Sequence, residues 1–285
     1  MKKKRDIQTY FNQKQKLTLK NPTYRRQVKF LTDWFINEDK GTTGDLTSQA
    51  LIPKNKQTTA TIIAKQNGII AGLEEVQWLA TCCMLHVACY VKDSRPVREG
   101  QKIMEISGST RKILLLERTI LNVLQRMSGI ATQTHALIKR TNGKALLCST
   151  RKTQWGLLDK KAVTVGGGGT HRLGLHDFIL IKENHLSQIS DFRFQISDFW
   201  EIEVENQKEA LQWAEKKPGA MMFDDFTPTQ IKKTIAKLPK NIIFEASGGI
   251  NEKNIADYAN TGVDIISMGA LTHSVKALDI GMYIQ

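Results

Sequence analysis

Hydrophobic residues in the second half of the chain form short runs that alternate with longer amphipathic segments. The runs are KALLC (144–148), DFILIK (177–182), WEIEVE (200–205), AMMFDD (220–225), NIIFEAS (241–247) and VDIISMGA (263–270). Three of the segments between them, 206–217, 227–238 and 251–262, have the composition of short helices. Repeated strand and helix units predict a parallel sheet, and this many in succession favour an α/β barrel.

The first half of the chain mixes element types. Residues 27–39 have the spacing of an amphipathic helix, and residues 59–80 read as a strand, a glycine-bearing turn and a second helix. Residues 97–109 predict a turn followed by a short strand. A long helix is expected from about Leu114. The pattern therefore predicts an α+β layer that precedes the barrel.

Length and composition exclude several classes of protein. With 285 residues, of which 41% are hydrophobic and 24% charged, the chain can bury a large core and is not disordered. Its apolar runs, such as residues 113–116, are far shorter than the roughly 18 residues that a membrane span needs. The basic start is followed by polar residues and does not resemble a secretory signal. We expect a cytosolic protein without a membrane partner.

The cysteines suggest a metal partner and the net charge suggests a polyanionic one, but their positions in the chain favour neither. Cys82, Cys83, Cys89 and Cys148 lack the paired spacing of a zinc site, so we interpret them as reduced and mostly core residues. Residues 1–29 carry ten lysines and arginines against one acidic residue, so they hold +9 of the net charge of +13. This extension could be a solvated tail, a helix with a charged face or a weak nucleic-acid arm. We expect the solvated tail.

Charged residues and glycines end the successive hydrophobic runs. They are Arg151, Lys152, Lys182, Glu203, Asp224, Ser247, Gly248, Gly249 and Gly269. In an α/β barrel the carboxyl ends of the strands converge on one site. We therefore expect a single pocket that is built from distant parts of the chain.

The residue types predict the chemistry of that pocket. Arg118, His171 and Arg172 would join the basic residues in a cationic cluster, which suits a substrate with several anionic groups. Glu203 and Asp224 offer the hard oxygen ligands that Mg²⁺ prefers. The glycine turns in EASGGI and SMGAL can hold a phosphate through backbone N–H groups. The set predicts a magnesium-bound phosphorylated sugar beside a carboxylated partner.

Several of these features also have simpler interpretations. The VGGGGT run (165–170) could be only a flexible loop, and His171 could be a surface or core histidine. Glu201, Glu203 and Glu205 alternate along one strand and could form a solvated edge. The recurrence of anion-binding and metal-binding residue types at the same end of successive units favours the site.

Long motifs resemble one enzyme family. They are NEDKGTTGDLTS (37–48), ERTILNVLQRMSGIAT (117–132), residues 150–186 from TRKT to ENHL, EIEVEN (201–206), MMFDDF (221–226) and residues 244–280, which begin FEASGGI. The chain from about residue 28 closely resembles quinolinate phosphoribosyltransferase. This resemblance implies an N-terminal α/β sandwich packed on an open α/β barrel, with active sites shared in a homodimer or a higher oligomer of it. The implied divisions are a basic extension (1–27), the sandwich (28–113), the barrel (114–271) and a C-terminal segment that returns to the sandwich (272–285).

The resemblance also implies roles for individual residues. The quinolinate-binding set would be Arg118, Arg151, Lys152, His171, Arg172 and Lys182. Glu203 and Asp224 match acidic residues near the ribose and the metal, and with Lys152 they would be the catalytic residues. The phosphate-side loops would contain Ser247, Gly248, Gly249, Gly269 and His273.

Three departures from the family pattern stand out. Ser149 occupies a position where the family usually has aspartate, and Asp225 one where it usually has asparagine. The segment before EIEVE is shorter than usual and contains a near-duplicated heptad, QISDFRFQISDF (188–199). We expect residues 187–199 to form a short or irregular crossover in place of a full barrel helix.

The expected activity is transfer of phosphoribosyl from phosphoribosyl pyrophosphate to quinolinate with decarboxylation, a step of NAD biosynthesis. One alternative is a related phosphoribosyltransferase with another acceptor, such as the molybdenum-operon paralogue. Another is a catalytically impaired barrel that binds nucleic acid through its basic extension, which we do not expect.

Overall fold

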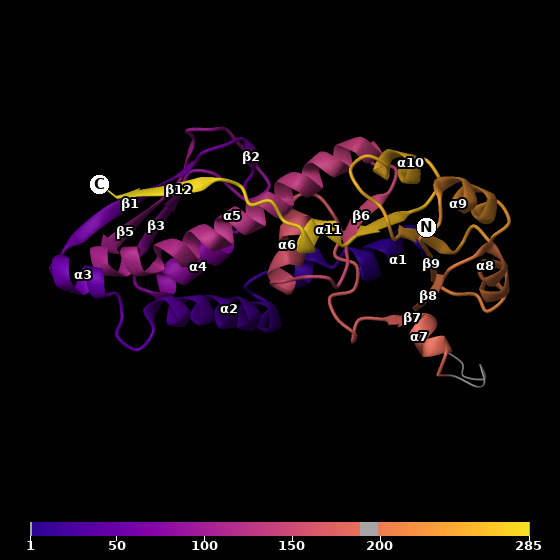
Figure 1. Ribbon diagram of the computed structural model, residues 1–285, viewed down its shortest axis with the longest axis horizontal. Helices are drawn as coiled ribbons and strands as arrows, with labels where there is room; N and C mark the ends of the chain where they lie inside the picture. The colour runs from indigo at the N-terminus through magenta and orange to yellow at the C-terminus, as the bar shows by residue number, and fades with distance from the viewer. Residues whose placement is uncertain (1, 189–198, 285) are drawn as a thin grey trace. The chain divides into compact units, whose positions relative to one another are not determined.

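The computed structural model describes residues 2–188 and 199–284, and Figure 1 traces its helices and strands. The chain divides into two compact units. Unit 1 consists of Met1–Lys14, Thr134–Thr153 and Gly168–Ser274, and unit 2 of Gln15–Gln133, Gln154–Gly167 and Val275–Gln285.

Unit 1 is built on a six-stranded parallel sheet with the order β6-β11-β10-β9-β8-β7. Its strands are β6 (Leu146–Ser149), β7 (Ile179–Ile181), β8 (Trp200–Val204), β9 (Ala220–Asp224), β10 (Ile243–Ser247) and β11 (Ile265–Met268). Each predicted hydrophobic run thus forms a strand. The α/β barrel that the alternating units predicted is confirmed, and so is its open form, which the family resemblance implied.

A short helix follows each of the strands β7 to β11. These helices are α7 (Glu183–Leu186), α8 (Gln207–Ala214), α9 (Pro228–Ile235), α10 (Ile255–Ala259) and α11 (Ala270–His273). Helix α8 begins where the Asn206 side chain accepts a hydrogen bond from the Glu209 N–H, and α9 begins with a capping box from Thr227. Figure 1 shows α8, α9 and α10 on the outer side of the sheet, which leaves its inner face to form the barrel interior.

The N-terminal segment of unit 1 is folded against the barrel. It contains α1 (Lys2–Asp6) and the π-helical turn η1 (Ile7–Phe11). Phe11 is fully buried in the hydrophobic cluster of the barrel interior, and the Lys3 ammonium lies 2.8 Å from the Asp264 carboxylate. The expectation of a solvated tail is therefore wrong, because apolar residues between the charged ones supply a face that the barrel buries.

Unit 2 contains an antiparallel sheet with the order β12-β1-β5-β3 and a separate β2-β4 pair. The strands are β1 (Gln57–Ala64), β2 (Gly68–Ile69), β3 (His86–Cys89), β4 (Pro96–Val97), β5 (Lys102–Ser109) and β12 (Ile280–Ile284). The helices are η2 (Lys14–Lys16, at the unit boundary), α2 (Pro22–Lys40), α3 (Leu46–Leu51), α4 (Leu73–Cys82) and α6 (Leu157–Val165). Pairing of β12 with β1 brings the C-terminal segment into this unit.

Helix α5 (Thr110–Thr141) belongs to both units. It begins at Thr110, before the expected Leu114, and the two units divide within it, between Gln133 and Thr134. A Cβ at Gly129 would lie 2.2 Å from the Lys276 carbonyl oxygen. Glycine is required there because the C-terminal segment crosses the helix at close range.

The cysteines are free thiols, as expected, but only one of them is a core residue. Cys148 is buried, Cys83 is half-buried, and Cys82 and Cys89 are exposed. The prediction that most of them are core residues is wrong because α4 ends at Cys82 and Cys89 lies on the edge strand β3.

Two further expectations concern the crossover and the membrane. The predicted irregular crossover falls largely on residues 189–198, which lie outside the described residues, so it stays a prediction. Among the described helices, none is both long and apolar enough to cross a membrane.

Unit 2 holds a group of charged side chains around the start of α4. The Lys161 ammonium lies 2.9 Å from the Glu75 carboxylate, which also accepts a hydrogen bond from the Tyr24 hydroxyl at 2.7 Å. Asp93 accepts a hydrogen bond from the N–H of Leu73, which is the first residue of α4. Burial, followed by the negative charge of Glu75, raises the pKa of the Asp93 carboxyl from 3.8 to about 6.

Replacing Asp93 with asparagine should therefore stabilise unit 2 at neutral pH. The folded state holds the Asp93 proton more tightly than the unfolded state does. The contribution of this carboxyl to the free energy of unfolding therefore falls as pH rises from about 4 to about 6, and it stays low above that range. The variant should gain about 1–3 kcal/mol at pH 7.5 and about nothing at pH 3.5. Denaturant titrations at both values measure this, and an equal effect at both would contradict it.

Candidate active site

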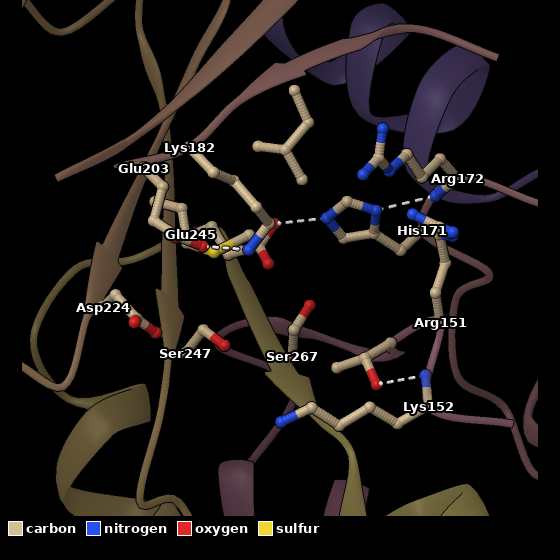
Figure 2. A pocket seen from close by; sticks show the side chains of 13 residues that line it. Arg151, Lys152, His171, Arg172, Lys182, Glu203, Asp224, Glu245, Ser247 and Ser267 are labelled. Carbon is tan, nitrogen blue, oxygen red and sulfur yellow. Dashed lines mark hydrogen bonds and ion pairs between the residues drawn. The ribbon is translucent and has the colours of Figure 1, made fainter. Parts of the chain in front are cut away.

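A pocket of about 300 Å³ lies at the carboxyl ends of the barrel strands of unit 1 (Figure 2). Its volume falls at the lower end of the range for small-molecule sites. It is lined by Thr150, Arg151, Lys152, His171, Arg172, Leu180, Lys182, Glu203, Met222, Asp224, Glu245, Ser247 and Ser267. Residues from β8, β9, β10 and β11 and from the segments after β6 and β7 therefore meet in one cavity, as the convergence argument predicted.

The structure brings most of the predicted site residues together. Those that line the pocket are Arg151, Lys152, His171, Arg172, Lys182, Glu203, Asp224 and Ser247. Four others, Gly248, Gly249, Gly269 and His273, follow β10 and β11 in unit 1 and do not line it. Arg118 is an exposed residue of the part of α5 that belongs to unit 2.

Two carboxylates stand on one wall of the pocket. Glu203 forms an ion pair with the Lys182 ammonium. Partial burial, and then the charge of Glu203, raises the pKa of the Asp224 carboxyl. Within the described part of the chain, no hydrogen bond or ion pair engages the Asp224 carboxylate. A pair of like charges with one unneutralised member suits a divalent cation with oxygen ligands.

The opposite wall is cationic. Arg172 is only 6% exposed, and burial, followed by the nearby charge of Arg151, lowers the pKa of its guanidinium. Among residues 2–188 and 199–284, no side chain pairs with this guanidinium. A buried cation beside a second cation is costly unless an anion neutralises it. The wall is thus suited to bind a carboxylate or a phosphate.

His171 lies at the base of the cationic wall with a defined ring orientation. Its Nδ1 accepts a hydrogen bond from the Arg172 N–H at 2.7 Å, so the ring proton of the neutral form is on Nε2. Nε2 lies 3.1 Å from a Glu245 oxygen and 3.5 Å from a Glu201 oxygen (Figure 2 shows His171 facing Glu245). The backbone of His171 has φ of +48°, a conformation that needs support from its surroundings.

Sequence reasoning did not select Glu201 and Glu245 as site residues. Both side chains are fully buried, and desolvation together with the charge of Glu245 raises the pKa of the Glu201 carboxyl well above its usual value. The interpretation of Glu201 as part of a solvated edge is wrong. Each residue lies two positions before a predicted site residue, Glu203 or Ser247, so strand alternation could have revealed them.

The trio of His171, Glu201 and Glu245 has residue types that could bind a metal ion, with ligand atoms within 4.8 Å of one another. The Nδ1 hydrogen bond places the His171 proton on Nε2, the atom that faces the carboxyls. A protonated nitrogen cannot ligate a metal. The geometry therefore does not favour a metal centre at this position. It favours a buried cluster in which the Nε2–H of His171 faces the two carboxyl groups.

The glycine turns have identifiable steric causes. Gly248 and Gly249 have φ of +84° and +60°, and a Cβ at Gly248 would lie 2.2 Å from an Asp225 oxygen. A Cβ at Gly269 would lie 3.1 Å from Lys152 Cδ and 3.0 Å from the His273 ring. These contacts place Gly269 and His273 next to the pocket residue Lys152. The backbone conformation therefore requires glycine at Gly248 and Gly249, whereas a side chain at Gly269 would press on the side chains of Lys152 and His273.

The two unusual residues take different positions. Ser149 is fully buried, and its hydroxyl donates to the Thr170 carbonyl oxygen at 3.3 Å. Asp225 is exposed with φ of +53°, and its N–H donates to the Ser247 carbonyl oxygen at 3.0 Å. Both residues fit the local structure.

Comparison with known proteins identifies the family. The family model "Quinolinate phosphoribosyl transferase, C-terminal domain" matches residues 130–283, and the corresponding N-terminal domain model matches residues 45–128. The chain belongs to the quinolinate phosphoribosyltransferase family. The resemblance that the motifs suggested is thus confirmed over both units.

Similar quinolinate phosphoribosyltransferase sequences cover most of the chain. A probable nicotinate-nucleotide pyrophosphorylase (carboxylating) of Methanothermobacter thermautotrophicus is 35% identical over 260 residues, which cover 85% of this chain and 93% of that protein. A protein of the same name from Bacillus subtilis is 36% identical over 274 residues, which cover 90% and 93%.

Solved structures show the same fold. The nicotinate-nucleotide pyrophosphorylase of Francisella tularensis superimposes with a TM-score of 0.84 at 33% identity and covers 91% of this chain and 96% of its own. NadC of Streptococcus pyogenes gives a TM-score of 0.85 at 30% identity, with coverage of 91% and 97%.

Proposed function

We propose that the protein transfers phosphoribosyl from phosphoribosyl pyrophosphate to the ring nitrogen of quinolinate and releases the 2-carboxylate as CO₂. The products are nicotinate mononucleotide and pyrophosphate, which places the reaction in NAD biosynthesis. The observation that carries this proposal is the pocket itself. It sets the buried Arg172 guanidinium, with Arg151 beside it, opposite the carboxylates of Glu203 and Asp224.

The cationic wall would bind and orient quinolinate. Its two adjacent carboxylates match guanidinium groups, which bind planar carboxylates through two parallel hydrogen bonds. The Nε2–H of His171 faces Glu245, so its role is to shape the base of the pocket. The pyridine nitrogen has a free lone pair and needs no general base. After the ring nitrogen is alkylated, it withdraws electrons and favours loss of the neighbouring carboxylate.

The acidic wall would act on the sugar. Positive charge develops on the ribose as pyrophosphate departs, and Glu203 and Asp224 can stabilise it electrostatically. Lys152 would neutralise the leaving phosphates, and the Ser247–Gly249 turn would hold the 5-phosphate through backbone N–H groups. Positioning and electrostatics would therefore supply most of the rate enhancement.

The donor set fits Mg²⁺, the cofactor expected from the sequence. Glu203 and Asp224 would hold the ion, and it would supply charge neutralisation for the pyrophosphate. The unneutralised carboxylate of Asp224 supports this assignment.

The direct test is incubation of the purified protein with quinolinate, phosphoribosyl pyrophosphate and Mg²⁺, followed by chromatography for nicotinate mononucleotide. Formation of the nucleotide with one equivalent of CO₂ supports the proposal. Turnover of another pyridine acid in its place would support the paralogue. Absence of product with steeply salt-dependent binding to nucleic acid would support the impaired barrel.

We further propose that the working unit is a homodimer with shared active sites in the cytosol. Arg118, a member of the quinolinate-binding set implied by the resemblance, lies in unit 2, whereas the other cations of that set line the pocket of unit 1. A two-fold partner could supply Arg118 to each pocket reciprocally. Higher oligomers can be built from such a dimer.

Subunit mixing should reveal the sharing. Arg118→Ala and Lys182→Ala proteins are each expected to lose most of their activity toward quinolinate, but after subunit exchange a mixed dimer has one site with both residues intact. About a quarter of the wild-type activity should return in an equal mixture if exchange is random. Activity assays before and after exchange, with exchange verified by two affinity tags, measure this. No recovery despite exchange would refute the shared site.

A further inference from the structure

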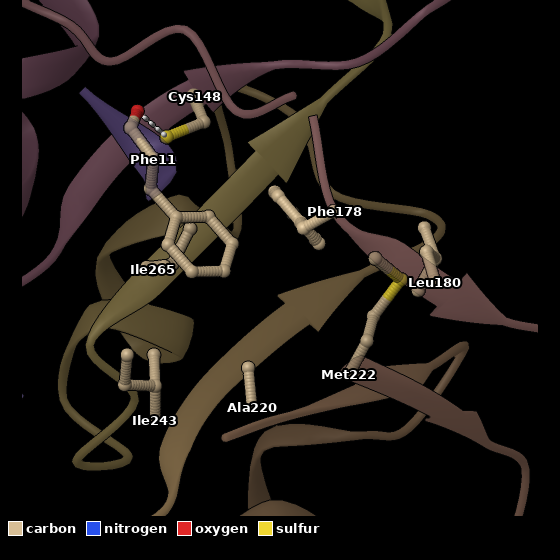
Figure 3. Packing of buried hydrophobic residues seen from close by; sticks show 8 residues of the cluster. All are labelled: Phe11, Cys148, Phe178, Leu180, Ala220, Met222, Ile243 and Ile265. Atoms are coloured by element: carbon tan, nitrogen blue, oxygen red, sulfur yellow. Dashed lines mark hydrogen bonds between the residues drawn. The ribbon is translucent and has the colours of Figure 1, made fainter. Parts of the chain in front are cut away.

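The N-terminal segment closes the barrel interior at the end opposite the pocket. Phe11 packs with Ala220, Ile243 and Ile265, which are the first residues of β9, β10 and β11 (Figure 3). The Tyr10 ring stacks on Phe199 at 4.0 Å. These residues precede the region matched by the family models, which begins at residue 45. Residues 2–14 therefore form a plug of the barrel that the matched family models do not cover.

The plug is also bonded to the loop that carries His171. The Phe11 carbonyl oxygen accepts hydrogen bonds from the N–H groups of Thr170 at 2.8 Å and of His171 at 3.0 Å. The Phe11 ring meets the imidazole edge to face, with ring centroids 5.0 Å apart. One residue of the plug therefore contacts both the backbone and the side chain of a pocket residue.

Gln13 holds the same loop from a second direction. Its N–H donates to the Thr170 hydroxyl at 3.0 Å, and its side-chain amide donates to the Asp177 carboxylate at 3.0 Å. Asp177 in turn accepts a hydrogen bond from the Leu173 N–H. The loop from Thr170 to Asp177 is thus tied to the plug at both ends.

Gly169 shows how closely the two segments approach. A Cβ at this position would lie 2.7 Å from the Phe11 carbonyl oxygen and 2.7 Å from the Cys148 sulfur. The last glycine of the VGGGGT run is therefore required by the plug, which explains part of a motif that otherwise reads as a flexible loop.

We propose that the N-terminal segment, residues 2–14, is a positioning element of the substrate pocket, with Phe11 and Gln13 holding the Thr170–Asp177 loop so that His171 and Arg172 face the substrate. His171 has a left-handed backbone, which persists only where its surroundings enforce it. The Phe11 carbonyl supplies that support. The proposal rests on the proposed function, because it assigns the cationic wall to quinolinate.

The expected signature is selective. Loss of the plug contact should displace the cationic wall, whereas Glu203, Asp224 and the turn after β10 are held by their own strands. A Phe11→Ala variant should raise the KM for quinolinate about tenfold to a hundredfold, since small misplacements of binding groups have effects of this size. Its KM for phosphoribosyl pyrophosphate should not change. Phe11→Leu, which keeps an apolar plug, should recover most of the loss.

Ile231→Ala is the matched control. Ile231 is fully buried in α9 on the outside of the sheet and lies away from the pocket residues. It should lower the melting temperature, as Phe11→Ala does, without changing either KM. Equal changes in both KM values for Phe11→Ala, or no change in the KM for quinolinate, would overturn the proposal. If Phe11→Ala does not fold, Gln13→Ala takes its place, because it spares the apolar cluster. Gln13→Ala must then raise the KM for quinolinate and leave the KM for phosphoribosyl pyrophosphate unchanged.

Binding of a non-reacting dicarboxylate separates this proposal from the proposed function. Benzene-1,2-dicarboxylate has the two carboxylates of quinolinate without its nucleophilic nitrogen, and calorimetry measures its binding without turnover. We expect weaker binding to Phe11→Ala than to the wild-type protein. Absence of product from the wild-type enzyme would refute the function alone. Equal affinity of the two proteins for the dicarboxylate would refute the positioning role.

Discussion

Replacing Asp224 with asparagine is expected to lower kcat by about a hundredfold to a thousandfold, the size of effect seen when one electrostatic contact to a transition state is removed. The side chain keeps its shape but loses the charge that would face the ribose and the metal ion. Glu203→Gln should have an effect of the same order, and it also leaves the Lys182 ammonium without its carboxylate partner. Steady-state assays with both substrates saturating measure kcat directly.

Glu205→Gln is the control for these two variants. Glu205 follows Glu203 by two positions, but its side chain is exposed and does not line the pocket. It should retain wild-type kcat. If Asp224→Asn and Glu203→Gln kept full activity while folded, the acidic wall would have no catalytic role and the magnesium assignment would fail with it.

The second large effect is expected at the basic residues that line the pocket. Alanine at Arg172, Arg151 or Lys182 removes a charge-assisted contact of about 1.5–3 kcal/mol, so kcat/KM for quinolinate should fall by about tenfold to a hundredfold or more. Arg172 should show the largest loss, since its buried guanidinium has no other partner among the described residues. The free energy of unfolding should change little for Arg172→Ala, because no protein anion among the described residues loses a partner there, whereas Lys182→Ala removes the partner of Glu203.

Arg140→Ala provides the comparison for the arginine variants. Its guanidinium pairs with Glu252 at an exposed position of unit 1 that is separate from the pocket. It should leave the kinetic constants unchanged. Wild-type use of quinolinate by all three pocket variants would show that the cationic wall does not bind the substrate.

The strands and the acidic wall of the pocket were predictable because their signals are local. A short hydrophobic run followed by a polar residue and a turn specifies a strand that ends at the barrel mouth, and β8, β9 and β10 all follow this pattern. Parallel strands place those ends together whatever the lengths of the connections between them. Glu203, Asp224 and Ser247 could therefore be assigned to one pocket before any contact between them was known.

The N-terminal segment could not be predicted in the same way. Its charge is a property of composition, and ten basic residues within 29 suggest a solvated tail. The burial of Phe11 depends on the space left between the first residues of three distant strands, and that space exists only in the folded barrel. Cys89 was misjudged for a related reason, since an edge strand and a core strand have similar sequences.

The sequence by itself determined the order of strands and helices, the residue types at the strand ends and, through its long motifs, the family. These depend on neighbours along the chain, which a single sequence contains in full. Only the tertiary structure decided that Glu201 and Glu245 meet His171, that Arg118 belongs to the other unit, and that Phe11 supports the loop of the pocket. The contacts of His171 and of Phe11 join residues that are far apart in the chain, and the burial and charge at such contacts depend on which surfaces the fold brings together.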